Sequence, residues 1–519
     1  MSDQSLVPIL HKRDLNFVLG ALMMGMFLSA LDSTIVSTAL PTIVGDLHGA
    51  NHLSWVVVAY LLATTVTTPL WGKLGDLHGR KGYFQASIVI FLIGSVLCGF
   101  AHSMLELVIF RAFQGLGSGG LMVGAQAVMA DVIAPRDRGR YAGWFGAVFG
   151  TSTIVGPLLG GVLVDYTSWR WIFFVNLPLG IAALAACAAY LPSSKARVQH
   201  TIDYAGIFTL SISATALILF TSLGGISFPW SSWRSLTLVA VGLLAAVACI
   251  FVERRSVEPI FAPRLFKNKV FLSASAIGFV VGFAMYGAMV FLPLYYQDVR
   301  LISPTMSGLR LVPMMAGLFA TSIFAGQMVS KGVRYRPFPI TGTALMTLGL
   351  WLFSFIGVST SSWLIAFFMV VFGMGLGLVM QILTTAVQNA VLPEDIGAGT
   401  AGSNFFRSMG GSFGTAVFGA LFANQLPKAL AADVHGLPPG SAAQSAASWT
   451  PQFLHHLPKQ VFNEIAHALS TTIAGMYIWS IPFGLLALAL SFTLPELQLR
   501  KSLTPHADEV PMSTDGHIL

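Results

Sequence analysis

Long apolar runs recur along the whole chain and constrain its fold more than any other feature. Fourteen runs are long enough to be candidate membrane spans, at about residues 15–41, 53–71, 83–101, 105–133, 141–164, 171–191, 204–223, 235–253, 271–297, 305–330, 337–357, 362–391, 398–424 and 471–494. A helix needs about 20 apolar residues to cross a bilayer. These runs use up most of the 519 residues, so a large soluble domain is excluded. The sequence predicts an all-α polytopic membrane protein.

The composition agrees with lipid as the main solvent. Only 9% of the residues are charged, whereas soluble domains carry about 25%. The three cysteines, Cys98, Cys187 and Cys249, lie within apolar runs without metal-ligand spacing, so neither a disulfide framework nor a metal site is expected. The sequence has no phosphate-binding loop and no HExxH. We therefore expect no enzyme activity and no cofactor, and an ion gradient as the energy source.

The basic residues fall mainly in every second segment between the spans. If the N-terminus is cytoplasmic, the cytoplasmic segments hold most of the 28 Lys and Arg residues, as the positive-inside rule requires. This predicts an N-in, C-in topology and accounts for the net charge of +7. A nucleic-acid partner would need these residues gathered on one polar surface, so none is expected. The absence of an N-x-[ST] acceptor favours a bacterial inner (plasma) membrane.

Two charged residues lie well inside predicted spans. Asp32 sits about 13 Å, and Arg111 about 9 Å, below the predicted outer surface at 1.5 Å per residue. A charge at mid-bilayer is costly and usually faces a cavity or a partner. The two side chains are predicted to meet, either as a proton-coupling pair or as a permanent ion pair that holds two helices in register. Arg310 and Arg407 lie near span ends and are predicted to extend toward the interface.

The segment GKLGDLHGRKG (72–82) joins the second and third spans. Gly72 and Gly79 allow a tight turn and close helix approach. Asp76 can cap a helix or pair with Arg80. By composition alone this is also an ordinary charged loop.

The fifth span is rich in small residues. Small residues let helices pack closely in lipid, and a proline bends its helix. Packing alone would explain this set, which consists of Gly146, Gly150, Gly156, Pro157, Gly160 and Gly161.

Four glutamines are candidates for a substrate cavity, namely Gln114, Gln126, Gln381 and Gln388. Gln381 and Gln388 are seven residues apart and share one helix face. Contacts between helices are an equally good explanation for them.

The 72–82 segment resembles the signature loop of the major facilitator superfamily. Several other motifs resemble its fourteen-span drug:proton antiporter branch: LDSTIVSTALP (31–41), RAFQGLGSGG (111–120), WRWIFFVNLPLG (169–180), IDYAGI (202–207) and SGLRLVPM (307–314). Ser37 and Thr38 depart from the first-helix pattern, where Asn and Val are usual. The resemblance covers about residues 15–494.

The resemblance implies two pseudo-symmetric six-helix halves with two helices inserted between them, 14 transmembrane helices in all. The implied division is a cytoplasmic tail 1–14, a six-helix bundle 15–191, two additional helices with a cytoplasmic linker 192–270, a six-helix bundle 271–494 with an outer loop 425–470, and a cytoplasmic tail 495–519. The later part of that loop is predicted either as a short amphipathic helix at the interface or as a solvated loop.

The resemblance also implies roles for individual residues. Asp32 and Arg111 would couple transport to protons, and the G-x5-G-P-x2-G-G pattern of the fifth span would mark an exporter. The implied cytoplasmic gate consists of Gly72, Asp76, Gly79, Arg80, Lys81 and Asp131. A reduced copy of the signature loop, GQMVSKGVRYR (326–336), lacks the acid, so a gating role there is not expected.

The function expected from these features is proton-coupled efflux of lipophilic, cationic compounds by a monomer working through alternating access. Two alternatives remain open: export of one endogenous metabolite or siderophore, and a non-transporting receptor or assembly factor on the same fold.

Overall fold

The computed structural model is helical throughout its described part. It describes residues 12–47, 53–133, 141, 144, 148, 151–152, 155–156, 158–164, 166–191, 203–224, 228–256, 258–434 and 458–498. The only β-type pairing among these residues is an isolated bridge between Gly224 and Phe228.

The N-terminal half contains α1 (Lys12–Leu47), α2 (Leu53–His78), α3 (Arg80–Gly99), α4 (Met104–Val132), α6 (Trp171–Phe174) and α7 (Asn176–Tyr190). The hairpin α8 (Tyr204–Leu223) and α9 (Trp233–Glu253) follows, and then the short α10 (Pro263–Lys267). The C-terminal half contains α11 (Lys269–Leu294), α12 (Pro304–Leu309), α13 (Val312–Ser330), α14 (Pro337–Phe353), α15 (Ser362–Ala390), α16 (Ile396–Asp433) and α19 (Lys459–Ser491).

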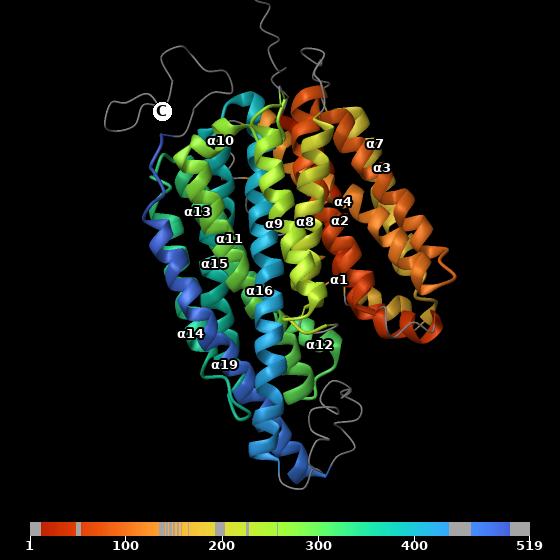
Figure 1. Ribbon diagram of the computed structural model, residues 1–519, viewed down its shortest axis with the longest axis vertical. Coiled ribbons are helices and arrows are strands. Elements are labelled where there is room, and N and C mark those ends of the chain that lie inside the picture. The colour runs from red at the N-terminus through yellow and green to blue at the C-terminus, as the bar shows by residue number, and fades with distance from the viewer. Residues whose placement is uncertain are drawn as a thin grey trace, which may run out of the picture.

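The two halves lie side by side. In Figure 1 the red and orange N-terminal helices form one side and the green to blue C-terminal helices the other. α16 makes the main connection between the halves by packing against α2 and α4. The α8–α9 hairpin lies across this junction, because α8 touches both α2 and α16.

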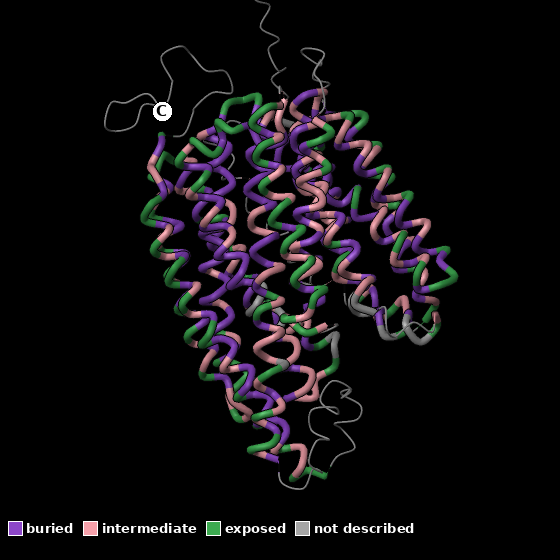
Figure 2. Tube along the Cα trace, viewed as in Figure 1, coloured by how far each residue is buried: buried purple, intermediate pink, exposed green. Residues whose placement is uncertain are grey.

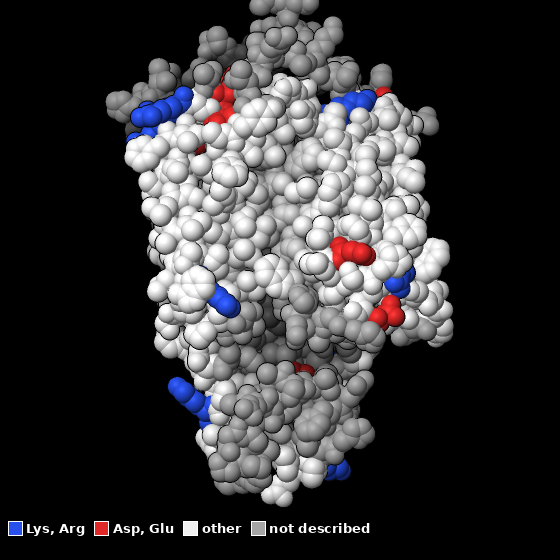
Figure 3. All heavy atoms as spheres, turned by 45° about the vertical axis from the view of Figure 1, so that its right-hand side comes forward, with Lys and Arg blue, Asp and Glu red and all other residues white. Residues whose placement is uncertain are grey.

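The surface between the two ends of the bundle suits lipid. Ten described helices are long and apolar enough to cross a membrane, and Lys269–Met285 and Pro337–Phe353 are shorter apolar stretches. Buried residues face the interior of each half in Figure 2. Figure 3 shows a broad, largely uncharged band on one face, with Lys and Arg above and below it. Fourteen spans with both termini in the cytoplasm remain a prediction from the sequence.

Two helices extend into the predicted outer loop. The outer loop was expected at 425–470, but α16 continues to Asp433 and α19 begins at Lys459. Alanine is the best helix former, and the segment ALAAD extends α16 beyond its apolar part. The segment expected as a separate interfacial helix or a solvated loop is instead the first part of α19. Residues 435–457 of the predicted loop lie outside the described residues.

The predicted span 305–330 is broken in two. α12 ends at Leu309 and α13 begins at Val312. Pro313, at the start of α13, has no backbone N–H and is accommodated best in the first turn of a helix. The break places Arg310 in a turn, where its Nη1 donates to Ser362 Oγ at 2.6 Å.

A π-helical segment, η2 (Tyr295–Val299), follows α11 and contains Asp298. Burial raises the pKa of Asp298 to about 6. When folding raises the pKa of an acid, the folded state favours the protonated form of that acid. Ionisation of Asp298 therefore lowers the stability of the fold as the pH rises from about 4 to above 6.

We expect Asp298→Asn to stabilise the protein by about 1–2 kcal/mol at pH 7–8 and to have no effect near pH 4. Unfolding in detergent at the two pH values measures the difference. An equal effect at both values would contradict the account, since an amide does not titrate.

Candidate functional site

Asp32 and Arg111 form a buried ion pair in the core of the N-terminal half. Asp32 lies on α1 and is 0% exposed, and Arg111 lies on α4 and is 1% exposed. Arg111 Nη1 donates to Asp32 Oδ2 at 2.5 Å. The structure thus brings together the two charges that were placed at similar depth, and their role in proton coupling remains a prediction.

Two amides complete the hydrogen bonding of the Asp32 carboxylate. Gln114 Nε2 donates to Oδ1 at 2.8 Å, and Gln114 Oε1 accepts from Arg111 at 2.7 Å. Asn176 Nδ2, at the start of α7, donates to the same Oδ1 at 3.1 Å and to Ser95 Oγ at 3.0 Å. Three donors from α4 and α7 therefore bind the two oxygens of the Asp32 side chain. Gln114 belongs to this network and is a partner of the acid.

A tyrosine lies against the guanidinium of Arg111. The Tyr60 ring, on α2, lies 4.0 Å from the Arg111 Cζ. Its hydroxyl donates to the Ser29 carbonyl at 3.2 Å and lies 2.7 Å from Ser118 Oγ. A cation is attracted to the face of an aromatic ring, so Tyr60 helps to hold Arg111 in place. Neither Asn176 nor Tyr60 is predicted as a site residue from the sequence. A lone Asn in the apolar run WRWIFFVNLPLG was a usable signal for the first.

Glycines in the RAFQGLGSGG segment let α4 approach its neighbours. A Cβ on Gly115 would lie 2.5 Å from the Tyr60 carbonyl oxygen of α2. A Cβ at Gly120 would lie 2.5 Å from Ser87 Cβ of α3. Real Cβ atoms do not come this close, so the short helix spacing that positions Arg111 depends on these glycines.

A second polar site lies where α2 turns into α3. Gly79 makes this turn at φ 100°, a conformation that favours glycine. We call this end of the bundle, with the start of α16, the turn end. Asp76 Oδ1 accepts from Arg80 Nη2 at 2.7 Å and from the Gly397 N–H at 3.0 Å, and Asp76 Oδ2 accepts from the Ala398 N–H at 2.7 Å. A carboxylate of one half thus caps a helix N-terminus of the other half.

Arg80 and Lys81 tie the turn to the rest of the N-terminal half. Arg80 Nη1 forms an ion pair with Asp131 at the end of α4 and donates to the Ala127 carbonyl at 2.8 Å. Lys81 Nζ donates to the last carbonyls of α7, at Leu191 (2.6 Å) and Ala188 (2.9 Å). The structure therefore brings the predicted gate residues together.

Two glycines make a close approach between the halves. A Cβ on Gly72 of α2 would lie 2.5 Å from Ala401 Cβ and 2.6 Å from the Gly397 carbonyl oxygen of α16. A Cβ on Gly397 would lie 2.5 Å from the Gly72 carbonyl oxygen. The cap of Asp76 on α16 is therefore reachable only because both positions lack side chains.

The fifth span is described only in part. Gly156 packs against Thr34 of α1, two residues from Asp32, where its Cβ would lie 2.8 Å from Thr34 Cβ. Gly160 is buried and Gly161 is partly exposed. The remaining members of the predicted motif, Gly146, Gly150 and Pro157, lie outside the described residues.

The other glutamines lie near the contact between the halves. Gln126 Oε1 on α4 accepts from Asn404 Nδ2 on α16 at 2.8 Å. Gln388 Nε2 on α15 donates to Thr400 Oγ1 at 3.1 Å and to the Gln126 carbonyl at 3.4 Å. Gln381 is partly exposed on the same helix. Gln126 and Gln388 therefore join the halves in this conformation, and a place in a substrate cavity remains a prediction for them.

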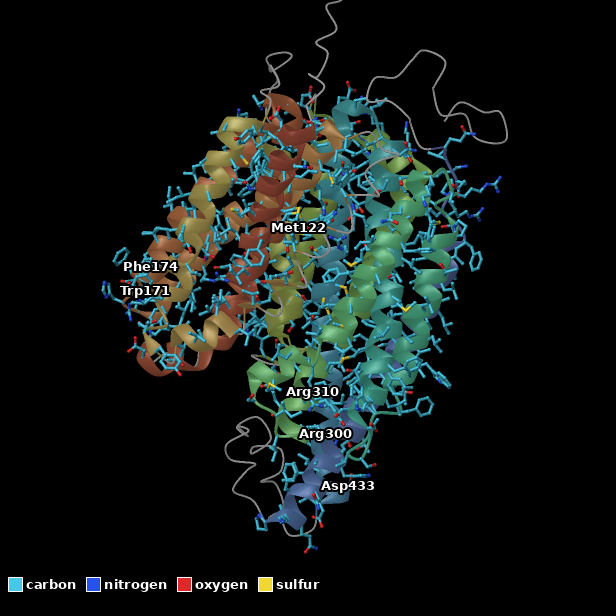
Figure 4. The ribbon with its side chains drawn as sticks, turned by 180° about the vertical axis from the view of Figure 1, so that it is seen from behind. Met122, Trp171, Phe174, Arg300, Arg310 and Asp433 are labelled. Carbon is cyan, nitrogen blue, oxygen red and sulfur yellow. The ribbon has the colours of Figure 1, made fainter. Side chains whose placement is uncertain are left out.

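The two remaining intramembrane arginines differ in position. Arg310 lies with Arg300 toward the end of the C-terminal half where α16 and α19 project, as expected for a residue near the interface (Figure 4). Arg407 is partly buried, and its extension toward the interface remains a prediction. It lies eleven residues into α16, and its Nη2 donates to Asn404 Oδ1 at 2.7 Å.

The second copy of the signature loop, 326–336, lacks an acid of its own, and Glu496 from beyond the last helix lies against it. Gly332 adopts φ 93° between α13 and α14, as Gly79 does between α2 and α3. Glu496, beyond the last helix, accepts from the Tyr335 and Arg336 N–H groups at 3.1 and 3.0 Å. Leu494 and Leu497 beside it are buried. The first residues of the predicted tail 495–519 are thus part of the C-terminal half.

We expect Glu496→Ala to lower the free energy of unfolding by about 1–2 kcal/mol, since it leaves two N–H groups at the start of α14 without their acceptor. Glu496→Gln keeps an acceptor oxygen and should cost less. Thermal unfolding in detergent measures both. Equal stability of the wild type and the Ala variant would contradict this capping role.

Comparison with known proteins identifies the family. The sequence model of the Major Facilitator Superfamily matches residues 22–415. This chain belongs to the major facilitator superfamily. It is 41% identical over 400 residues to the multidrug transporter protein MdtP of Bacillus subtilis, covering 77% of this chain and 74% of MdtP. It is 34% identical over 485 residues to multidrug resistance protein 3 of the same organism, covering 92% of this chain and 94% of the relative.

Solved structures of the superfamily share the fold at low identity. The human organic anion transporter MFSD10 matches with a TM-score of 0.61 at 13% identity, covering 90% of this chain and 99% of MFSD10. The proton:xylose symporter XylE matches with a TM-score of 0.59 at 14% identity, covering 94% and 97% of the two chains. The chain is therefore a superfamily transporter, and its substrate does not follow from the fold.

Proposed function

We propose that this transporter exports lipophilic compounds, cations among them, in exchange for protons. The observation that carries the proposal is the buried network of Asp32, Arg111, Gln114 and Asn176. It contains an acid and a base held in the core of a membrane bundle, where charges are expensive and usually functional. The relatives named as multidrug transporters support export of more than one compound.

The network gives a physical basis for exchange. In this conformation the Asp32 carboxylate accepts hydrogen bonds from the side chains of Arg111, Gln114 and Asn176, which balance its negative charge. A proton on Asp32 removes the charge that balances Arg111 and makes this arrangement unfavourable. Proton binding thus favours a different arrangement of α1, α4 and α7, and release of the proton restores this one. Asp32 is the proposed proton acceptor and Arg111 its modulator.

The turn end supplies the gate. Two sets of hydrogen bonds join the halves at or near this end: N–H groups of α16 donate to Asp76, and Asn404 donates to Gln126. We take the turn end as cytoplasmic, with both termini on that side and fourteen spans in a bacterial plasma membrane. The structure then corresponds to a state closed toward the cytoplasm, and export requires these contacts to open and reform. A monomer suffices, because each element of the mechanism lies within one chain.

Dye efflux from cells that express the protein tests this function. Efflux should stop when a protonophore collapses the gradient, and unrelated lipophilic dyes should compete with one another. Efflux that persists with the protonophore would contradict proton exchange. Absence of competition would favour the exporter of one metabolite, and absence of any efflux would favour the receptor or assembly factor.

A further inference from the structure

The segment between α9 and α11 touches both halves at the turn end. We call its described residues 258–268, which include α10, the α9–α11 linker (Figure 1). Near its start, Lys73 Nζ of α2 donates to Glu258 Oε2 at 2.8 Å. Further along, the guanidinium of Arg264 donates to both carboxylate oxygens of Asp395, at 2.7 and 3.1 Å, directly before α16. The linker is therefore bonded to the N-terminal half at one point and to the C-terminal half at another.

Apolar packing fixes the linker against α16. Ile260 and Phe261 are buried, and their N–H groups donate to the carboxylate of Glu253 at the end of α9, at 3.2 and 3.1 Å. The centre of the Phe261 ring lies 6.0 Å from that of Phe405 on α16. Buried residues of α8 belong to the same apolar cluster. A movement of α16 relative to α2 therefore carries the linker with it.

Lys73 lies inside the closed contact between the halves. It follows Gly72, which approaches the backbone of α16, and precedes the capping residue Asp76 by three positions. Lys73 is 8% exposed, and lysine is rarely buried so far without a partner. Loss of one member of a buried ion pair leaves the other charge uncompensated. Glu258 therefore supplies the charge that allows Lys73 to stay buried here.

We propose that Lys73 and Glu258 are further positioning residues of the gate. Their ion pair fastens the α9–α11 linker to α2 and holds the turn end closed. When α16 moves away from α2, the linker moves with α16 and the pair separates. The pair thus stabilises the closed state and not the open one, which is the condition for shifting the equilibrium between them. The inference rests on the gate proposed above and gives the α8–α9 hairpin a role in it.

Reversing the two charges singly and together tests the proposal. Spin labels at Val89 and Leu392, exposed on different halves, report the distance between the halves in the purified full-length protein. Lys73→Glu and Glu258→Lys each place like charges together. We expect each to raise the ratio of open to closed molecules about tenfold, as for loss of one hydrogen bond between charged groups. The double variant restores an ion pair and should return the distance to that of the wild type.

Lys267→Glu is the matched control. Lys267 is exposed on the same linker and forms no ion pair with any residue that the structure describes, so the same reversal should leave the distance unchanged. Glu258→Gln removes the charge without reversing it and should shift the distance in the same direction by less. This variant decides the question if a reversal prevents folding.

A wild-type distance in the single variants would overturn the proposal. So would a double variant as open as the single ones, because each reversal would then disturb the structure independently of the pair. Opening in Lys267→Glu would point to a general effect of charge and would also overturn it. The distances are measured without a dye or a proton gradient, so neither result depends on whether the protein exchanges protons.

Discussion

Asp32→Asn is expected to reduce gradient-driven export to the level of cells that lack the protein. Asn matches Asp in shape and keeps an oxygen for Gln114 and Arg111, but it neither carries a charge nor takes up a proton. The variant also leaves the buried guanidinium of Arg111 without its carboxylate, which costs stability. Efflux is therefore measured together with the amount of folded protein in the membrane, so that loss of coupling is separated from loss of fold.

Asp46→Asn is the matched control for this change. Asp46 lies on the same helix and also pairs with an arginine, at 3.2 Å from Arg170 Nη1, but the pair is partly exposed. Exposed ion pairs contribute at most about 1 kcal/mol, so efflux should be close to that of the wild type. Similar losses in both variants would mean that any ion pair of α1 has this effect and would contradict a special role for Asp32.

Gly72→Val is expected to prevent closure of the turn end and thereby to stop transport. The Cβ alone would lie 2.5 Å from Ala401 Cβ and 2.6 Å from the Gly397 carbonyl oxygen, both on α16. A backbone oxygen cannot move aside by a change of side-chain rotamer. The valine side chain must therefore push the two halves apart. The cap of Asp76 on α16 is then lost as well.

Spin labels at Val89 and Leu392 measure this separation, since each side chain is exposed on a different half. The distance between them should increase in Gly72→Val and stay constant in Gly82→Val. A Cβ at Gly82 meets nothing within 4 Å, so this second variant makes the same change next to the same turn without a clash. An unchanged distance in Gly72→Val would show that the glycine contact does not control closure.

Local patterns were sufficient to predict most helices and to single out several residues that the structure brings together. Apolar length predicts a span, and a lone acid such as Asp32 attracts attention because burial is costly. The glycines and charged residues of 72–82 predict a turn and a helix cap from their local pattern. The structure shows the turn at Gly79 and the cap at Asp76.

The contacts that depend on tertiary structure were not predictable from one sequence. Gln126 and Asn404 are 278 positions apart, and neither has a local feature that indicates the other. Glu496 looked like the start of a tail because its partners, the N–H groups of the α13–α14 turn, are 160 or more positions away.

Proton release on addition of substrate tests the central claim most directly. Inverted membrane vesicles with a lumenal pH indicator, energised to an acidic lumen, are exposed to a transported dye on the cytoplasmic face. The account predicts that the dye drives protons out of the lumen with the wild type and with Asp46→Asn, and that Asp32→Asn gives no dye-dependent proton movement. Dye-dependent proton movement that continues in Asp32→Asn would contradict the assignment of Asp32 as the proton acceptor.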